Sequence, residues 1–389
     1  MAETQGVTPG VTQAEFDELV SLLRDFIRRE VMPAEADIDA SDEIPGRLIA
    51  QAKEMGLYGY ALPAQYGGLG LSVVQQVRVA IELGYTSPAF RSLFGTNNGI
   101  AGQVLVLAGT DEQRQQWLPR LASGEVVASF ALTEPDAGSD PSRLVTTARP
   151  QDGGWVIDGL KRYITNAPAA DAFMVFARTD PEAPPGQGIG VFIVPAGASG
   201  LTVAPRDHKM GQAGAWTADV AFDGVRVPGD ALVGAAAQAG YATAMRSLAH
   251  GRLSIAGLCV GVSARLVDES VSYARERVQG GHVIGEYQLI QAMLADSETE
   301  YLAARALVLD AAERYEAGTD RRLGPSAAKY FASEAVGRIA DRAVQIHGGS
   351  GYIRGIAVER LYRDVRLFRI YEGTSQIQQL VIARELLRS

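Results

Sequence analysis

Cysteine is almost absent from this chain. Cys259 is the only cysteine among 389 residues, so the chain can form neither an internal disulfide nor a cysteine cluster that would hold a metal. Cys259 lies in the apolar stretch 253–262, and we expect it to be a small buried core residue. That stretch is the longest apolar run of the sequence, and it is too short and too rich in Gly and Ser to span a membrane.

Basic residues are also in short supply. The chain has 36 Lys and Arg against 45 Asp and Glu, which gives a formal net charge of -9. A nucleic-acid-binding surface is therefore not expected, and an anionic ligand would have to meet individually placed Arg or Lys residues. No basic residue precedes Arg24, a pattern that fits neither a signal peptide nor a transit peptide. We expect a cytoplasmic protein with no membrane or nucleic-acid partner.

Hydrophobic spacing divides the chain into three regions. Helical spacing runs to about residue 124 and begins with a capping box formed by Thr12 and Glu15. Short strands separated by Asp-Gly turns follow to about residue 235, and long helical patterns fill the remainder. We predict an α+β multidomain chain, with an N-terminal α-helical domain (1–124), a small antiparallel β domain (125–235) and a C-terminal four-helix bundle (236–389).

A single carboxylate near the C-terminus is the first candidate for chemistry. Glu372 stands between apolar residues and Gly373, just before Thr374 and Ser375, either of which can cap the helix that follows. A carboxylate held there and shielded from water can serve as a base. The alternative is an exposed glutamate in a helix-entry loop.

Two stretches of the β region are candidates for ligand binding. Residues 130–140 end a strand in an irregular turn whose N–H groups can face a flavin edge or a phosphate, although turn chemistry alone also explains them. Tyr163 and Thr165 alternate with Ile164, so a planar ring could rest on Tyr163 while Thr165 donates to its edge. The Gly-rich segment 186–190 lacks the dinucleotide-binding spacing and opens no helix, which argues against a Rossmann site.

These stretches belong to a set of ordered motifs that resembles one family. Over residues 12–388 the sequence resembles an acyl-CoA dehydrogenase. The motifs that carry the resemblance are 132–140, 163–166, Lys209-Met210-Gly211, Ala328-Lys329, 345–349, 359–364 and the Glu372 turn.

The resemblance implies noncovalent FAD, an acyl-CoA substrate, a homotetramer and an electron-transferring flavoprotein as electron acceptor. It makes Glu372 the catalytic base and assigns substrate contacts to Ser139, Arg252 and Gly373, with no metal site. The implied FAD-binding residues of the same subunit are Phe130, Leu132, Thr133, Gly138, Ser139, Tyr163, Ile164 and Thr165. Those implied to reach the FAD of a neighbouring subunit are Arg277, Gln288, Gln345, Ile346, Gly348, Gly349, Thr374, Ser375 and Gln376.

Departures from the family pattern bear on these roles. Some relatives carry the base one residue before the position of Arg252; here that residue is Gly251, so Glu372 has no rival. Gly280-Gly281 stands where Phe-Gly is usual, which indicates either weaker FAD binding or simply a flexible loop.

Arginines recur every third residue just before the Glu372 turn. They are Arg360, Arg363, Arg366 and Arg369. We interpret them as a solvated or subunit-interface face paired with Glu359 and Asp364, rather than as an anion-binding track.

The expected reaction is FAD-dependent dehydrogenation of an acyl-CoA to a trans-2-enoyl-CoA, with Glu372 as base. Two alternatives stay open. One is an acyl-CoA or nitroalkane-type oxidase that passes electrons to oxygen, and the other is a non-enzymatic FAD-holding scaffold.

Overall fold

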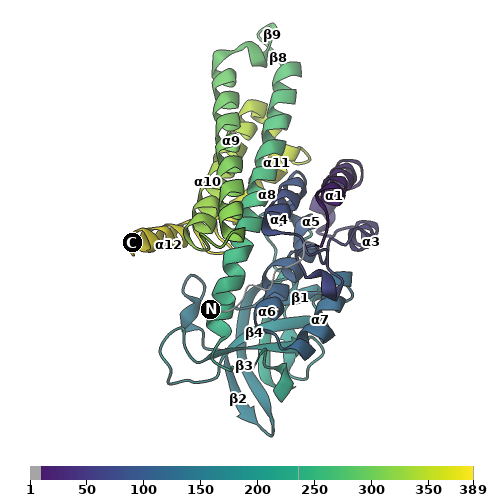
Figure 1. The fold of residues 1–389 in the computed structure, drawn as a ribbon. Helices are drawn as coiled ribbons and strands as arrows, with labels where there is room; N and C mark the ends of the chain where they lie inside the picture. The colour runs from purple at the N-terminus through teal and green to yellow at the C-terminus, as the bar shows by residue number, and fades with distance from the viewer. Residues whose placement is uncertain (1–9, 235, 389) are drawn as a thin grey trace.

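The structure is a computed structural model that describes residues 10–234 and 236–388. Helices fill the first third of the chain, a β sheet follows, and long helices form the remainder (Figure 1). The predicted fold class is confirmed. The N-terminal α-helices are α1 (Gln13–Phe26), α2 (Glu35–Ser41), α3 (Gly46–Glu54), α4 (Val73–Gly84), α5 (Pro88–Gly95), α6 (Ala101–Ala108) and α7 (Asp111–Ser123).

Helix starts follow local sequence signals. The Thr12 hydroxyl accepts a hydrogen bond from Glu15 N at 3.3 Å, and the Glu15 carboxylate accepts one from Thr12 N at 2.7 Å, so the predicted capping box is confirmed. Ser72 and Gln75 cap α4 in the same way. Each pair satisfies N–H groups that a helix leaves free at its N-terminus.

The β sheet occupies the lower part of the molecule in Figure 1, below the long helices. Its strands are β1 (Ala128–Ala131), β2 (Thr147–Gln151), β3 (Gly154–Thr165), β4 (Ala172–Arg178), β5 (Ile189–Pro195), β6 (Leu201–Val203) and β7 (Thr217–Pro228). They pair in the order β1-β4-β2-β3-β7-β6, with β5 on β4. Most neighbours are antiparallel, as predicted, but β4 runs parallel to β1 and to one residue of β2. The sheet is mixed because β4 comes after β2 and β3 in the chain but lies next to β1 and runs in the same direction as β1.

The C-terminal region contains three long helices and two short ones. The long helices are α8 (Gly240–Glu276), α9 (Gln288–Glu316) and α10 (Leu323–His347), and the short ones are α11 (Ala357–Val365) and α12 (Ser375–Leu386). We predicted four long helices, but α12 projects sideways from the bundle (Figure 1). Helix α4 of the N-terminal region packs against α8 and α9 instead.

Glycines bring α4 and α8 into direct backbone contact. A Cβ atom at Gly261 would lie 2.0 Å from the Ile81 carbonyl oxygen, and one at Gly84 would lie 2.3 Å from the Leu258 oxygen. The two helical regions consequently share one hydrophobic core, which runs from Phe16 of α1 to residues of α11. The domain boundaries at 124 and 235 stay a prediction.

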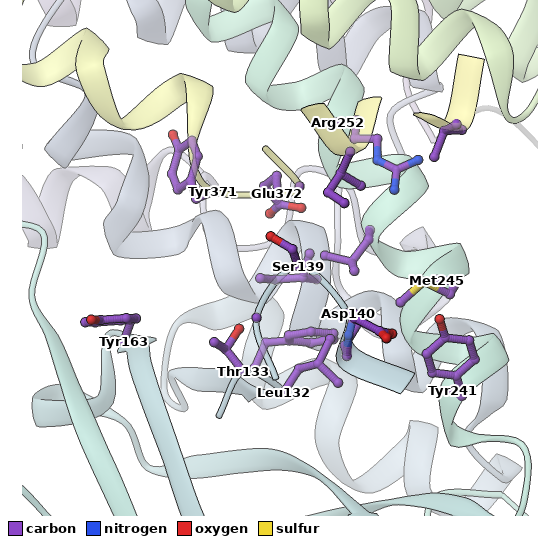
Figure 2. Close-up of a pocket in the computed structure, with 18 of the residues that line it drawn as sticks. Leu132, Thr133, Ser139, Asp140, Tyr163, Tyr241, Met245, Arg252, Tyr371 and Glu372 are labelled. Atoms are coloured by element: carbon purple, nitrogen blue, oxygen red, sulfur yellow. The ribbon is translucent and has the colours of Figure 1, made fainter. Parts of the chain in front are cut away.

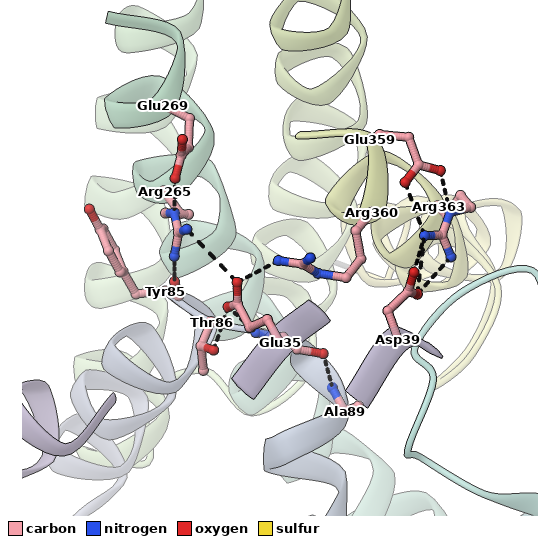
Figure 3. A network of polar contacts seen from close by, with 11 residues as sticks. Glu35, Asp39, Tyr85, Thr86, Ala89, Arg265, Glu269, Glu359, Arg360 and Arg363 are labelled. Atoms are coloured by element: carbon pink, nitrogen blue, oxygen red, sulfur yellow. Dashed lines mark hydrogen bonds and ion pairs between the residues drawn. The ribbon is translucent and has the colours of Figure 1, made fainter. Parts of the chain in front are cut away.

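A buried network of charges links these regions further (Figure 3). The Glu35 side chain is 5% exposed, and its Oε1 accepts hydrogen bonds from Thr86 Oγ1 at 2.6 Å and Ser87 N at 3.1 Å. Its Oε2 accepts a hydrogen bond from Arg360 and lies 3.8 Å from Arg265 Nη2. One carboxylate of α2 thus connects α8 and α11.

Two of the four predicted surface arginines therefore have a different role. Arg360 is buried, and Arg363 contacts Asp39 of α2 at 2.9 Å as well as Glu359 at 2.6 Å. The predicted Glu359 pair is confirmed, but the interpretation of Arg360 and Arg363 as a solvated face is wrong. Asp364 is buried and accepts a hydrogen bond from Gln212 N, so it forms no surface pair either.

We expect Glu35→Gln to lower the free energy of unfolding by about 3–5 kcal/mol, because it leaves Arg360 and Arg265 buried without their counter-charge. Urea unfolding followed by circular dichroism measures the loss. Glu30→Gln is the control, since its ion pair with Arg47 lies on the surface and should contribute little. Equal losses in the two variants would show that the buried network adds no special stability.

Candidate active site

A cavity of about 560 Å³ lies where the sheet, α8 and the start of α12 meet (Figure 2). Eleven of the predicted site residues line it. They are Phe130, Leu132, Thr133, Gly138, Ser139, Tyr163, Ile164, Thr165, Arg252, Glu372 and Gly373. The structure therefore brings together residues that are up to 243 positions apart in the sequence, from Phe130 to Gly373.

The turn after β1 is held by a buried lysine that the sequence did not single out. Lys161 Nζ donates to the Leu132 carbonyl at 3.1 Å and lies 2.7 Å from Glu134 Oε1. Glu134 also accepts hydrogen bonds from Val145 N and Thr146 N. Burial lowers the pKa of Lys161 to about 8, although Glu134 opposes the shift. The pair fixes the backbone from which Leu132 and Thr133 enter the cavity.

Tyr163 presents a bare ring to the cavity. A register shift between Lys161 and Ile164 distorts β3 there; Tyr163 has φ 56° and is 61% exposed. Among the described residues, the one group stacked on this ring is the Arg162 guanidinium, 5.0 Å from the ring centroid. Such an aromatic face suits a flat ring system.

Three hydroxyls beside this ring are unengaged. The side chains of Thr133, Ser139 and Thr165 make no hydrogen bond within residues 10–234 and 236–388. All three line the cavity. Free hydroxyls around an open aromatic face are what the polar edge of a flavin requires, so these residues fit the cofactor that the resemblance implies.

Glu372 sits on a strained turn that the protein holds at both carbonyls. Glu372 and Gly373 have φ values of 55° and 87°. Lys329 Nζ donates to the Gly373 oxygen at 2.7 Å, and Gln378 Nε2 donates to the Glu372 oxygen at 3.1 Å. The Thr374 hydroxyl caps α12 by accepting a hydrogen bond from Ile377 N at 3.3 Å, so Thr374 is the cap of the two residues predicted for it. A left-handed conformation is costly for a residue with a side chain, and these contacts maintain it.

The turn leaves its own hydrogen-bonding groups free. The backbone N–H groups of Glu372 and Gly373 donate no hydrogen bond within the described residues. Oε2 of Glu372 is buried and has no partner either. Burial raises the pKa of Glu372, whereas the nearby cations Arg91, Arg252 and Lys329 oppose the rise. The turn thus offers an acid–base group and unengaged donors next to each other.

The residue at position 251 explains how this carboxylate is accommodated. A Cβ atom on Gly251 would lie 2.8 Å from Glu372 Oε2. A side chain at this position would push the carboxylate aside. Gly251 therefore leaves space for Glu372, and it also means that no rival base stands at residue 251. Lys329 and Arg91 act on the same carboxylate from α10 and α5; the sequence offered the Ala328-Lys329 motif as a signal for the first and none for the second.

The other predicted FAD-binding residues lie elsewhere. Arg277, Gln288 and residues 345–349 surround the tip of the bundle, near the hairpin of β8 (Val278–Gln279) and β9 (His282–Val283) at the top of Figure 1. Ile346 is buried there and Arg277 is exposed. Within one chain they do not reach the cavity.

The three predicted FAD-binding residues at the start of α12 also lie outside the cavity, and they differ in exposure. Ser375 is buried and donates to Glu334 Oε1 at 2.6 Å, whereas Gln376 is exposed. Thr374 is occupied as the helix cap. None of the three lines the cavity.

Gly280 and Gly281 form the turn of the β8–β9 hairpin. Their φ values of 59° and 88° are those of a two-residue turn with both residues in the left-handed region. A Cβ atom at Gly280 would also lie 2.8 Å from the Tyr287 hydroxyl. The hairpin explains the glycine pair and replaces the interpretation of a flexible loop.

Cys259 is fully buried, as predicted, and burial raises the pKa of its thiol. Among the described residues, no group of His, Cys, Asp and Glu side chains is arranged to hold a metal ion. In the same part of the chain, every helix is too short or too polar to cross a membrane.

Three family models together cover most of the chain. The N-terminal, middle and C-terminal domains of acyl-CoA dehydrogenases match residues 13–125, 129–225 and 238–387. An acyl-CoA dehydrogenase of Bacillus subtilis is 39% identical over 366 residues, which is 94% of this chain and 96% of that protein. Subunit CarC of the caffeyl-CoA reductase-Etf complex of Acetobacterium woodii is 38% identical over 368 residues, with 94% and 97% coverage.

Solved structures agree with this assignment. The butyryl-CoA dehydrogenase of Megasphaera elsdenii superposes with a TM-score of 0.92 at 31% identity, covering 97% of this chain and 99% of that one. PigA, solved with FAD and proline, gives a TM-score of 0.91 at 26% identity and the same coverage. FAD is therefore the cofactor, and the bare ring of Tyr163 beside unengaged hydroxyls fits it. The chain belongs to the acyl-CoA dehydrogenase family, and it is an oxidoreductase that acts on CH–CH bonds.

Proposed function

We propose that the protein removes two hydrogens from an acyl-CoA thioester and gives a trans-2-enoyl-CoA. One observation carries this proposal. The Glu372 carboxylate is free of hydrogen bonds at Oε2, lies on a turn with unengaged N–H groups, and lines the same cavity as Tyr163 and Thr165. A base, donors for a carbonyl oxygen and a place for the FAD ring therefore converge on one space.

Glu372 removes the proton next to the thioester carbonyl. Its free backbone N–H can donate to the thioester oxygen and stabilise the negative charge that develops there. FAD, when bound, supplies the acceptor for the hydride that leaves the neighbouring carbon, which no amino-acid side chain can accept. The cations around Glu372 keep its ionised form accessible despite burial.

A second cavity, of about 680 Å³, is suited to the phosphates of CoA. It shares Tyr241, Met245 and Arg252 with the first. The arginines that line it are Arg246, Arg252, Arg321, Arg322, Arg384 and Arg388. Glu385 is the one acidic residue of the lining, and it pairs with Arg322 and Arg388. The remaining arginines are available for an anion, as phosphate groups require.

The electron acceptor and the assembly are part of the proposal. We infer that electrons pass to an electron-transferring flavoprotein, because CarC is named as a subunit of an Etf complex. Direct transfer to oxygen, as in an oxidase, is the alternative and would produce peroxide without an acceptor protein. CarC is named as part of a reductase complex, so double-bond reduction of an enoyl-CoA is the reverse direction in which the same residues can be assayed.

We also infer a homotetramer in which the bundle tip binds a neighbour's FAD. The predicted FAD residues lie at three separate places in one chain: the cavity, the start of α12 and the tip around Arg277. The tip residues can contribute to FAD binding only if another subunit brings them to its cavity.

Glu372→Gln tests the role of the base. We expect acyl-CoA still to bind, because the side chain keeps its shape, while flavin reduction slows by roughly 10²-fold to 10⁴-fold, as loss of a general base requires. Anaerobic stopped-flow absorbance measures the reduction. The control is Glu54→Gln, an exposed residue of α3. A variant that reduces its flavin within about tenfold of the parent would exclude Glu372 as the base.

Lys329→Met tests the cations around Glu372. The reaction needs ionised Glu372, so its rate rises with pH through the pKa of that group. Burial lowers the pKa of Lys329 to about 8, so at lower pH it is charged and favours ionisation of Glu372. Removing this cation should move the acidic limb of the pH–rate profile to higher pH.

The pH dependence of flavin reduction, with Lys53→Met as a control on the exposed side of α3, measures this shift. Lys329→Arg should retain most of the parent profile, because it keeps the charge. A rate loss that is uniform at all pH values would mean that Lys329 only supports the turn.

Arg277→Ala tests the contribution of the bundle tip. We expect the variant to lose FAD more readily on dialysis, with the cavity residues unchanged, because the tip would contact the cofactor of a neighbour. Flavin absorbance gives the FAD content and light scattering gives the assembly state. Arg314→Ala on the surface of α9 is the control. Parent protein that dissociates to monomers yet keeps stoichiometric FAD would contradict the proposal.

A further inference from the structure

A small cavity of about 50 Å³ adjoins Glu372. It shares Thr96 and Thr165 with the large cavity and extends toward α5. Its volume accommodates only a few non-hydrogen atoms, given that a water molecule in the liquid takes up about 30 Å³. If the carbon that loses its proton lies at Glu372, this cavity is the space for the far end of the acyl chain.

The walls of this cavity combine apolar residues, such as Ile100 and Leu367, with polar side chains. Its lining includes the polar side chains Arg91, Ser92, Thr96, Lys209, Gln212 and Thr217. Glu372 is the only acidic residue in the lining, against the two cations Arg91 and Lys209. Ser92, Thr96, Gln212 and Thr217 already form hydrogen bonds within the protein. An alkyl chain would, however, bring an apolar group against the two cations, which is costly in a buried site. The two cations therefore favour a short acyl group with an anionic end.

Arg91 is the most informative of these residues. It is 8% exposed, and its Nη2 donates to Ser254 Oγ at 2.8 Å. Its Nε is buried without a partner, and no carboxylate lies within ion-pair distance in the part of the chain that the structure describes. A guanidinium stays charged and only donates hydrogen bonds, so its burial calls for an anion.

The surrounding backbone keeps space for this cation. A Cβ atom at Gly95 would lie 2.6 Å from Arg91 Nη1. The charge of Arg91 also affects two neighbouring groups. It opposes the rise in the pKa of Glu372 that burial causes, and it adds to the burial that lowers the pKa of His250 to about 4. The cavity thus has a positive potential next to Glu372.

We propose that the substrate's acyl group is short and ends in a carboxylate, which binds to Arg91. This inference rests on the proposed acyl-CoA dehydrogenation and names its substrate class. The planar guanidinium can donate two hydrogen bonds to a carboxylate, and the Ser92 and Thr96 hydroxyls and the Lys209 ammonium line the same cavity. The competing role for Arg91 is that of a counter-charge for Glu372 alone, which would leave the acyl end unselected.

The parent enzyme gives the first test. Anaerobic flavin reduction is measured with succinyl-, glutaryl- and adipyl-CoA and with butyryl-, pentanoyl- and hexanoyl-CoA, which match them in carbon number. At least one carboxylate-ended ester should exceed its neutral partner by about 10²-fold or more in reduction rate divided by dissociation constant, because a site built for a polar group rejects the analogue that lacks it.

Two other outcomes would contradict different parts of the argument. If the neutral esters are the better substrates, the carboxylate inference is wrong while the proposed dehydrogenation stands. If no ester of either series reduces the flavin, the proposed function itself fails, and the inference fails with it.

Arg91→Met separates substrate binding from an effect on Glu372. At a pH where Glu372 is ionised, the variant should lose about 10²-fold or more with the carboxylate-ended ester and change less than about tenfold with the neutral one. Arg91→Lys, which keeps the charge but loses the fork of donors, should fall between. An equal loss with both esters would make Arg91 a counter-charge only and overturn the proposal.

Thermal unfolding provides a measurement independent of turnover. The carboxylate-ended ester should raise the melting temperature of Glu372→Gln, which binds without reacting, and should raise it less when Arg91→Met is added. Without ester, adding Arg91→Met to Glu372→Gln should not lower the melting temperature, because the change removes an unpaired buried charge. Arg78→Met, at a surface ion pair with Asp17, is the control. Equal stabilisation by the ester with and without Arg91 would contradict binding at this residue.

Discussion

The fold is constrained by the need to keep one buried carboxylate able to ionise. Glu372 Oε2 has no hydrogen-bond partner among the residues that the structure describes, and burial alone would favour the neutral form of the group. The opposing cations come from three helices: Arg91 from α5, Arg252 from α8 and Lys329 from α10. These helices belong to the two ends of the chain, so the N-terminal helices and the bundle must share one core for the site to exist.

The same requirement explains why the helical regions are joined by buried charges. Glu35 of α2 binds Arg360 of α11 and lies near Arg265 of α8, and these groups are nearly inaccessible. Apolar contacts between helices permit some sliding, whereas a buried ion pair is costly to leave unpaired. The network therefore fixes α11, and the Glu372 turn that follows it, relative to α5 and α8.

Local signals in the sequence predicted much of this arrangement. The capping box at Thr12, the strand turns, a cap at Thr374 or Ser375 and the candidate base at Glu372 all depend on neighbours within a few residues. What the sequence did not predict depends on pairs far apart in it: α4 against the bundle, Arg360 with Glu35, and Lys161 beneath the β1 turn. Hydrophobic spacing identifies the buried face of a helix but not the element that covers it, so Arg360 and Arg363 were placed on the surface.

Arg91 shows a further limit of predicting buried charges from the sequence, and a local signal that partly overcomes it. An arginine in a helix is ordinarily a surface residue, and the spacing around Arg91 gave no reason to single it out. The structure shows that small residues accompany the buried charges: Gly95 makes room for the Arg91 guanidinium, and Gly251 makes room for the Glu372 carboxylate. Glycine in a helix interior reduces helix stability, so its presence there needs a reason in packing. At these two positions the reason is the space that a charged side chain needs. Gly95 lies one turn after Arg91 in the same helix and could have been noticed in the sequence, whereas the pairing of Gly251 with Glu372 joins distant parts of the chain and could not.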